Sequence, residues 1–204
     1  MNNGLIIRVA RPTDVPALHR LILENLEAGH LLPRAVEDLE RHAHRFIVAD
    51  DAGAGVVGCG ELAPIGDSIA EVRSLVVHHA FRGRHIGSAL VDRIAADAAV
   101  RGFSTLCAFT HEPSHFVRLG FTIVPHIWVP EKIARDCTSC ALFRGCGQHA
   151  VTLTLRAGVS LRPQEPAAVI YGGRTAPARK HIVERLQLQE VDGRRAERKE
   201  PVPA

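Results

Sequence analysis

The residues whose types and spacing best suit chemistry form a basic, glycine-containing loop, Arg82-Gly83-Arg84-His85-Ile86-Gly87-Ser88. The loop follows an apolar run that ends near Val77 and precedes a stretch with helical periodicity. The first N–H groups of a helix lack intrahelical partners and lie at the positive end of its dipole, and arginines beside them can add charge-assisted hydrogen bonds. The loop therefore predicts a binding site for a phosphate or pyrophosphate group.

An ordinary glycine turn with solvated arginines would contain the same residues, so the loop alone leaves both interpretations open. Two other phosphate-binding motifs fit poorly. A P-loop requires a Lys-Ser/Thr pair, which is missing, and a dinucleotide fingerprint requires three glycines in a parallel strand–helix–strand unit. This loop contains only Gly83 and Gly87.

A second group with ligand-type side chains consists of Cys137, Cys140 and Cys146. Three thiolates would fill three of the four positions of a structural zinc site, with His149 or His126 as the fourth ligand. Packed thiols or a redox pair are the alternatives to zinc. The other two cysteines, Cys59 and Cys107, fall in apolar runs and are expected in the core. An odd cysteine count without a secretory signal pattern favours a reducing, cytoplasmic location.

Strands and helices alternate along the part of the chain that would position these residues. Apolar runs predict strands at 5–9, 45–49, 56–62, 69–77, 104–110, 121–124 and 149–155. Helical periodicity and capping residues predict helices at 13–29, 33–42, 86–100 and 115–119. Turn residues between the strands of 45–77 predict an antiparallel meander, in which Gly58 and Gly60 mark a close approach or a bulge.

Composition indicates one soluble domain with a tail. Of the 204 residues, 46% are hydrophobic and 23% charged, which is ordinary for a globular protein. The net charge of +3 arises in 159–204, which has nine Lys/Arg and six Asp/Glu, so the rest of the chain is neutral. A neutral body with 4% aromatic residues argues against a nucleic-acid surface, and no apolar run reaches the roughly 18 residues of a membrane span. The Pro-containing, charged segment 159–204 is expected to be disordered.

The loop and the order of the elements together resemble the GNAT superfamily of acetyltransferases. Arg82 and Gly87 match the family motif Arg/Gln-x-x-Gly-x-Gly/Ala, whereas His85 stands where the family usually has glycine. Leu119-Gly120-Phe121 matches another segment usual in the family. The resemblance covers about residues 5–156. It implies an α/β (α+β) GNAT fold, with a central mixed, mostly antiparallel sheet flanked by helices, in a domain at 1–158.

The resemblance also implies acetyl-CoA as co-substrate, lying in a splay between the strands 69–77 and 104–110. The implied cofactor-binding residues are Leu75, Val76, Val77, Arg82, Gly83, Arg84, His85, Ile86, Gly87, Ser88 and Phe116. Glu71 has the spacing of a family glutamate that accepts the amine proton, with an ion pair to Arg73 as the alternative role. Phe116 stands where many members of the family have a tyrosine that acts as the general acid. In this chain His115 or water would therefore protonate the leaving thiolate.

The segment 126–149, inserted before the last strand, resembles the short bacterial N-acetylglutamate synthases more specifically. In that subgroup a Leu-Pro-x-Lys-Val/Ile segment precedes Asp-Cys-x-x-Cys, and this chain has Val129-Pro130-Glu131-Lys132-Ile133 before Asp136-Cys137. The resemblance implies acetylation of the α-amine of L-glutamate, the first step of arginine biosynthesis. Arg73 and Lys132 are the candidates to bind the acceptor's carboxylates.

Two other functions stay open on the sequence. The chain could acetylate another small amine or a protein amine, or it could be a non-catalytic acyl-CoA sensor. The expected partners are small molecules, acetyl-CoA and an amino acid, without nucleic acid or membrane, and a homodimer is one option for the assembly.

Overall fold

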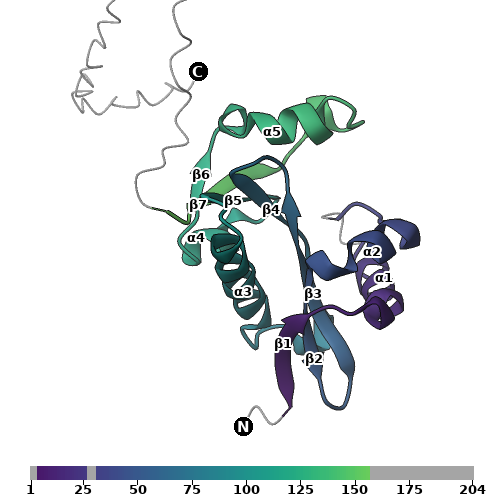
Figure 1. The fold of residues 1–204 in the computed structure, drawn as a ribbon. Coiled ribbons are helices and arrows are strands. Elements are labelled where there is room, and N and C mark those ends of the chain that lie inside the picture. Colours follow the sequence, from purple (N-terminus) through teal and green to yellow (C-terminus); the bar gives the residue numbers. More distant parts are fainter. Residues whose placement is uncertain (1–3, 27–30, 157–204) are drawn as a thin grey trace, which may run out of the picture. The chain divides into compact units, whose positions relative to one another are not determined.

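The computed structural model describes residues 4–26 and 31–156, which belong to the first of two units of the chain, Met1–Pro163 and Gln164–Ala204. In this part, helices cover both faces of one sheet (Figure 1). The tail expected at 159–204 lies outside the described residues, as does Gly29, where the first helix was expected to end. Within the described ranges, no helix has the length and apolar character needed to cross a bilayer.

The sheet has seven strands in the order β1-β2-β3-β4-β5-β7-β6. The bounds of the strands are β1 Leu5–Val9, β2 Phe46–Asp51, β3 Gly55–Pro64, β4 Ile69–Val77, β5 Thr105–Thr110, β6 Thr122–Val124 and β7 His149–Thr154. Neighbouring strands are antiparallel except β4 and β5, which are parallel. The expected mixed, mostly antiparallel sheet is confirmed, and β2, β3 and β4 form the expected meander.

The helices flank the sheet on opposite faces. Their bounds are α1 Val15–Leu23, α2 Val36–His42, α3 Ile86–Val100, α4 Pro113–Arg118 and α5 Pro130–Lys132. α1 and α2 pack on one face and α3 on the other (Figure 1). α1 is shorter than predicted. Beyond its end, the Asn25 side-chain amide donates to the carbonyl of Leu21 at 2.8 Å, which satisfies one of the helix's last carbonyl groups. The sequence did not predict α5 or the π-helical turn Ile133–Cys137 that follows it.

Helix α3 packs one apolar face on the sheet, as its periodicity predicted. Leu90, Val91, Ile94 and Ala98 are at most 1% exposed and belong to one core with residues of β2, β3 and β4. The contact is tight at Gly60, where an added Cβ would come within 2.9 Å of Ile94 Cδ1. Gly60 therefore marks a close approach between helix and sheet, because any larger residue would displace the α3 side chain.

We expect Ile94→Ala to lower the free energy of unfolding by about 2–5 kcal/mol, because the change leaves a cavity in a fully buried contact. Urea unfolding of the full chain measures the loss. Val100→Ala on the same helix is the matched control: Val100 is 88% exposed, so its truncation should change the unfolding free energy by less than about 0.5 kcal/mol. Similar losses in both variants would contradict the packing of α3 on the sheet.

A β-bulge distorts β4 where it pairs with β3. The register passes from Cys59↔Val76 to Glu61↔Arg73, so two residues of β4 lie opposite one residue of β3. One of those two residues, Ser74, has a φ of 49° in the left-handed region. A bulge bends its strand and increases the local twist, which re-aims the side chains on either side of it.

The parallel pairing of β4 with β5 is short. It runs only from Ile69↔Thr105 to Glu71↔Cys107, although β4 continues to Val77 and β5 to Thr110. Beyond Glu71 the two strands therefore separate and leave a cleft between them.

Candidate active site

The cleft between β4 and β5 holds a cavity of about 870 Å³. Its walls include Val72–Val77 of β4, Ala108–Thr110 of β5 and Phe116 of α4. Residues 31–34, before α2, and side chains of the segment after Val129 also line it. The structure thus brings Leu75, Val76, Val77 and Phe116, four predicted cofactor-binding residues, into one cavity.

The basic loop borders a second, smaller cavity of about 330 Å³ at the N-terminus of α3. The predicted cofactor-binding residues in its wall are Val77, Arg82, Gly83, His85, Ile86, Gly87 and Ser88. Arg84 is not among the lining residues; its guanidinium lies over the ring of Phe81, 4.9 Å from the centroid. Arg84 therefore makes a cation–π contact on the outside of the loop.

The loop backbone leads directly into the first turn of α3, and the first N–H groups of a helix have no partner within the helix. Gly83 has a φ of 76° and His85, the residue before α3, has a φ of 59°. Histidine tolerates this left-handed region better than most residues other than glycine, asparagine and aspartate. His85 thus takes the conformation that the motif's usual glycine would take, so the substitution does not prevent the turn.

We expect His85→Val to weaken CoA binding at least about tenfold, because a β-branched residue is strained at positive φ and would distort the turn. Titration calorimetry with CoA measures the affinity. His85→Asn is the matched control, since asparagine also tolerates this conformation, and it should bind CoA like the unchanged protein. Equal affinity in the valine and asparagine variants would show that the turn is not needed for the cofactor.

Arg82 holds the loop to two other elements. Its Nε donates to the Val77 carbonyl at 3.1 Å, and one terminal nitrogen donates to Asn25 Oδ1 at 2.7 Å. The guanidinium therefore ties the loop to the end of β4 and to the turn after α1, so Arg82 supports the cavity wall at the junction of three elements.

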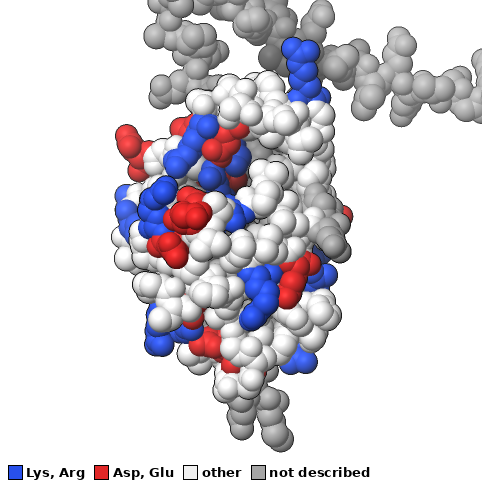
Figure 2. All heavy atoms as spheres, turned by 90° about the vertical axis from the view of Figure 1, so that its right-hand side faces the viewer, with Lys and Arg blue, Asp and Glu red and all other residues white. Residues whose placement is uncertain are grey.

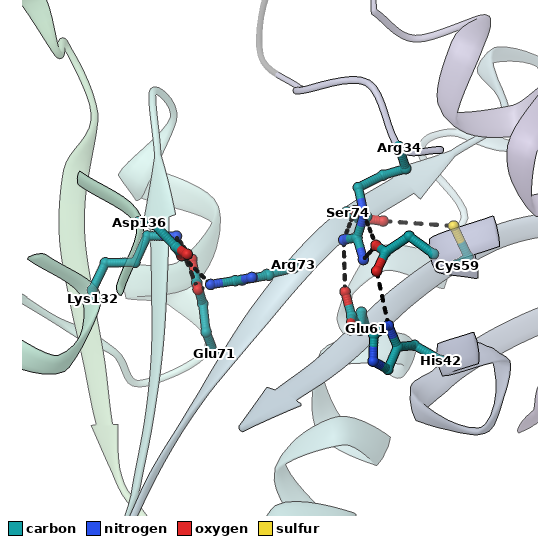
Figure 3. A network of polar contacts seen from close by, with 10 residues as sticks. Arg34, His42, Cys59, Glu61, Glu71, Arg73, Ser74, Lys132 and Asp136 are labelled. Atoms are coloured by element: carbon teal, nitrogen blue, oxygen red, sulfur yellow. Dashed lines mark hydrogen bonds and ion pairs between the residues drawn. The ribbon is translucent and has the colours of Figure 1, made fainter. Parts of the chain in front are cut away.

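Four charged side chains meet at the point where β4 and β5 begin to separate (Figure 3). We call Glu71, Arg73, Lys132 and Asp136 the β4 cluster. Lys132 Nζ lies 2.8 and 3.0 Å from the two carboxylate oxygens of Glu71 and 2.9 Å from Asp136 Oδ2. Arg73 Nε donates to Glu71 Oε2 at 2.5 Å, and another of its nitrogens donates to Asp136 Oδ2. The predicted base and both predicted acceptor-binding cations are thus in direct contact.

The β4 cluster combines burial with mutual charge compensation. Glu71 is 3% exposed. Burial alone would lower the pKa of Arg73, but the charge and hydrogen bond of Glu71, followed by the charge of Asp136, raise it above the ordinary arginine value. Burial alone would raise the pKa of Asp136, but Lys132 and then Arg73 hold it below the ordinary value. Ion pairing therefore holds the Arg73 guanidinium and the Asp136 carboxyl in their charged forms.

A second charged group lies across the cavity, beside α2 (Figure 3). We call Arg34, Asp38, His42 and Glu61 the α2 cluster. Arg34 contacts Asp38 at 2.6 Å and Glu61, which is buried in β3, at 2.7 Å, and His42 Nδ1 lies 3.0 Å from Asp38. Arg34 and Glu61 both line the cavity. Charges of both signs also lie close together over the face that carries α1 and α2 (Figure 2).

His115, the predicted acid, lies where the two cavities meet, because it lines both of them. Burial, and then the charge of Arg118, lowers the pKa of His115 below the ordinary histidine value. An added Cβ at Gly87 would lie 3.6 Å from His115 Nε2. The imidazole therefore faces the first turn of α3, between the loop and the wide cavity.

The five cysteines fall into two environments. Cys59 and Cys107 are fully buried, as expected, and burial raises the pKa of Cys59 to about 12. Cys137 and Cys140 are half-buried and Cys146 is exposed. Across residues 4–26 and 31–156, no three His, Cys, Asp or Glu side chains are grouped so as to hold a metal ion. The zinc site considered for the three cysteines of 137–146 therefore finds no support in their arrangement.

Sequence reasoning missed Asp136, Arg34 and Glu61. Glu61 had a visible signal, because a carboxylate inside the apolar run 56–62 must find a buried partner. Asp136 and Arg34 had no such signal. Each pairs with a residue four positions away, but the contacts that tie them to the strands, with Arg73 and Glu61 respectively, join distant parts of the sequence.

The chain matches known proteins over most of the described region. Residues 42–123 match the model of the acetyltransferase (GNAT) domain. An uncharacterised N-acetyltransferase of Chlorobaculum tepidum is 34% identical over 149 residues, which cover 73% of this chain and 96% of that protein. An amino-acid acetyltransferase of Mycobacterium tuberculosis is 34% identical over 119 residues, which cover 57% of this chain and 68% of that protein.

A solved structure is similar in both fold and sequence. The N-acetylglutamate synthase of Neisseria gonorrhoeae, in complex with coenzyme A and N-acetyl-glutamate, has a TM-score of 0.67 and 27% identity. The match covers 74% of this chain but 35% of that synthase, so this chain corresponds to about a third of the longer enzyme.

Proposed function

Because the chain belongs to the GNAT family of acetyl-CoA-dependent N-acetyltransferases, we propose that its acceptor is L-glutamate and that it acetylates the α-amine in the first step of arginine biosynthesis. The observation that carries this proposal is the position of Arg73 and Lys132, two cations side by side at the end of the cleft. An acceptor with carboxylates can accept hydrogen bonds from both cations, whereas the amines of a polyamine cannot. The amino-acid acetyltransferases and the N-acetylglutamate synthase among the similar proteins support the same acceptor class.

The cofactor lies along the cleft in this proposal. The amides at the start of α3 bind the pyrophosphate, with the loop residues around Gly83 and His85 allowing close approach. The backbone of Leu75–Val77 holds the pantetheine arm. The thioester then reaches the point where β4 and β5 separate, next to the β4 cluster.

Acetyl transfer follows from this placement. The neutral α-amine attacks the thioester carbonyl carbon, and the C–S bond breaks as the C–N bond forms. Glu71 accepts the amine proton, directly or through water, and His115 or water gives a proton to the thiolate. The lowered pKa of His115 makes its imidazolium a stronger acid but a less populated one at neutral pH, so water competes with it for this role. Orientation of amine and thioester supplies much of the acceleration.

The test is thiol release from acetyl-CoA by the purified full chain with L-glutamate and a panel of other amines. We expect release that depends on glutamate, with a higher kcat/KM than for any other acceptor. Release with other amines only would overturn the glutamate assignment and favour another small or protein amine. Binding of CoA without thiol release for any amine would favour a non-catalytic acyl-CoA sensor.

A further inference from the structure

Asp136 is a carboxylate at the place where the proposed function puts the acceptor's carboxylate. Its Oδ2 accepts hydrogen bonds from both Lys132, at 2.9 Å, and Arg73. Figure 3 shows that the side chains of Asp136 and Lys132 extend into the β4 cluster from one side, and that of Arg73 extends into it from the opposite side. One oxygen atom of the protein itself thus bridges the two cations that would bind an acidic acceptor.

The two carboxylates of the β4 cluster differ in how firmly they are held. Glu71 belongs to β4, pairs through both oxygens, and has a side chain 4% exposed. Asp136 contributes one oxygen to the cluster, is 32% exposed, and belongs to the short π-helical turn Ile133–Cys137. Such turns are rare and are frequently found at functional sites. Glu71 is therefore the fixed carboxylate and Asp136 the one that an entering ligand can replace.

Charge balance favours replacement over addition. Two cations and two carboxylates make the β4 cluster neutral, with Asp136 in place. A ligand carboxylate added beside Asp136 would place three anions around two half-buried cations, which is unfavourable at short range. A ligand carboxylate that takes the place of Asp136 keeps the balance and re-forms both hydrogen bonds, while Asp136 turns toward solvent.

We propose that Asp136 occupies the carboxylate subsite of the empty enzyme and is displaced from Arg73 and Lys132 by the acceptor's carboxylate. This inference rests on the proposed function and adds a source of specificity. A neutral or cationic amine cannot displace Asp136, so the subsite stays closed to acceptors without a carboxylate. Asp136 is thus a positioning residue, which keeps both cations aligned until an acidic ligand arrives.

The experiment measures binding of glutarate, a dicarboxylate with no amine to acetylate, by titration calorimetry on the full chain. We expect Asp136→Asn to bind glutarate about tenfold more tightly than the unchanged protein, because the competing carboxylate is gone. Asp136→Glu, which keeps a carboxylate, should return the affinity toward the original value. Equal or weaker binding by Asp136→Asn would overturn the proposal, since a residue that only supports Lys132 would weaken the subsite when lost.

Asp97→Asn is the matched control, because Asp97 also pairs with a cation four residues away, Arg93, but on α3 outside the cleft. Its glutarate affinity should not change. If Asp136→Asn is recovered unfolded, Asp136→Ser removes the same charge and carries the same expectation. Glutarate binding does not depend on turnover, so tighter binding together with absent glutamate-dependent thiol release would retain this inference and overturn the proposed function. With L-glutamate as acceptor, Asp136→Asn should lower the KM for glutamate about tenfold with little change in kcat.

Discussion

Lys132→Met is expected to raise the KM for L-glutamate by on the order of 30- to 150-fold while the KM for acetyl-CoA stays within about twofold. Methionine keeps much of the aliphatic length of lysine but removes the charge, so an acceptor carboxylate would lose one of its two cationic partners. Loss of one member of a buried, hydrogen-bonded charge pair costs about 2–3 kcal/mol or more, which corresponds to that range of KM. Steady-state kinetics with each substrate varied in turn separates the two constants.

The control for Lys132→Met is Arg93→Met, which removes a paired cation from the outer part of α3. It should leave both KM values unchanged. An unaltered glutamate KM in Lys132→Met would remove Lys132 from the acceptor site. A parallel rise in both KM values would indicate general damage to the cleft instead of the loss of one contact.

Glu71→Gln is expected to lower kcat by about 10²- to 10⁴-fold with L-glutamate, the range typical of a lost general base. Glutamine has nearly the same shape, and its side-chain oxygen can still accept from Arg73 and Lys132. The substitution therefore removes the capacity to take up the amine proton while it retains most of the geometry of the β4 cluster. The measurement is kcat across pH, because a faster rate of the variant at high pH, where more of the amine is already neutral, would identify the missing step.

The matched comparison for Glu71→Gln is Glu61→Gln. Glu61 is also a buried strand carboxylate paired with an arginine, but it lies in the α2 cluster. The melting temperature should fall by a similar amount in both variants, whereas kcat should fall much more in Glu71→Gln than in Glu61→Gln. Equal kcat losses would indicate that removal of a buried charge, and not of a base, explains the effect. If kcat changes by less than about threefold in Glu71→Gln, Glu71 is not the base, and its role is the structural ion pair with Arg73.

Local sequence patterns predicted most of the elements because each pattern reports the burial of one face. The spacing of Leu90, Ile94 and Ala98 was enough to place α3, and Gly60 indicated either a close approach or a bulge. The meander at 45–77 followed from turn chemistry. These features depend on neighbours within a few residues, and such information is present in the sequence itself.

The cleft and its charged groups depend on contacts that a local pattern does not contain. Lys132 and Glu71 are 61 positions apart, and Arg34 and Glu61 are 27 apart. The sequence analysis allowed for an ion pair between Glu71 and Arg73, which is observed, but it did not predict that Lys132 joins them. The bulge at Ser74 and the early end of β4–β5 pairing are set by register, which the alternation of side chains does not determine. The turn Ile133–Cys137 was not predicted, because such turns are rare and local periodicity favours an α-helix over them.

The short pairing of β4 and β5 also leaves room for a bound ligand to stabilise the folded domain. Three register positions connect the meander β1–β4 to the strands β5–β7, and beyond them the edges of both strands face the cleft. A ligand with amide groups lying there would make hydrogen bonds of the kind that a neighbouring strand makes elsewhere in the sheet. By mass action, a ligand that binds only the folded chain adds about 2.7 kcal/mol of stability at one hundred times its Kd. Coenzyme A bound in the cleft would therefore raise the melting temperature of the domain in proportion to the logarithm of its concentration.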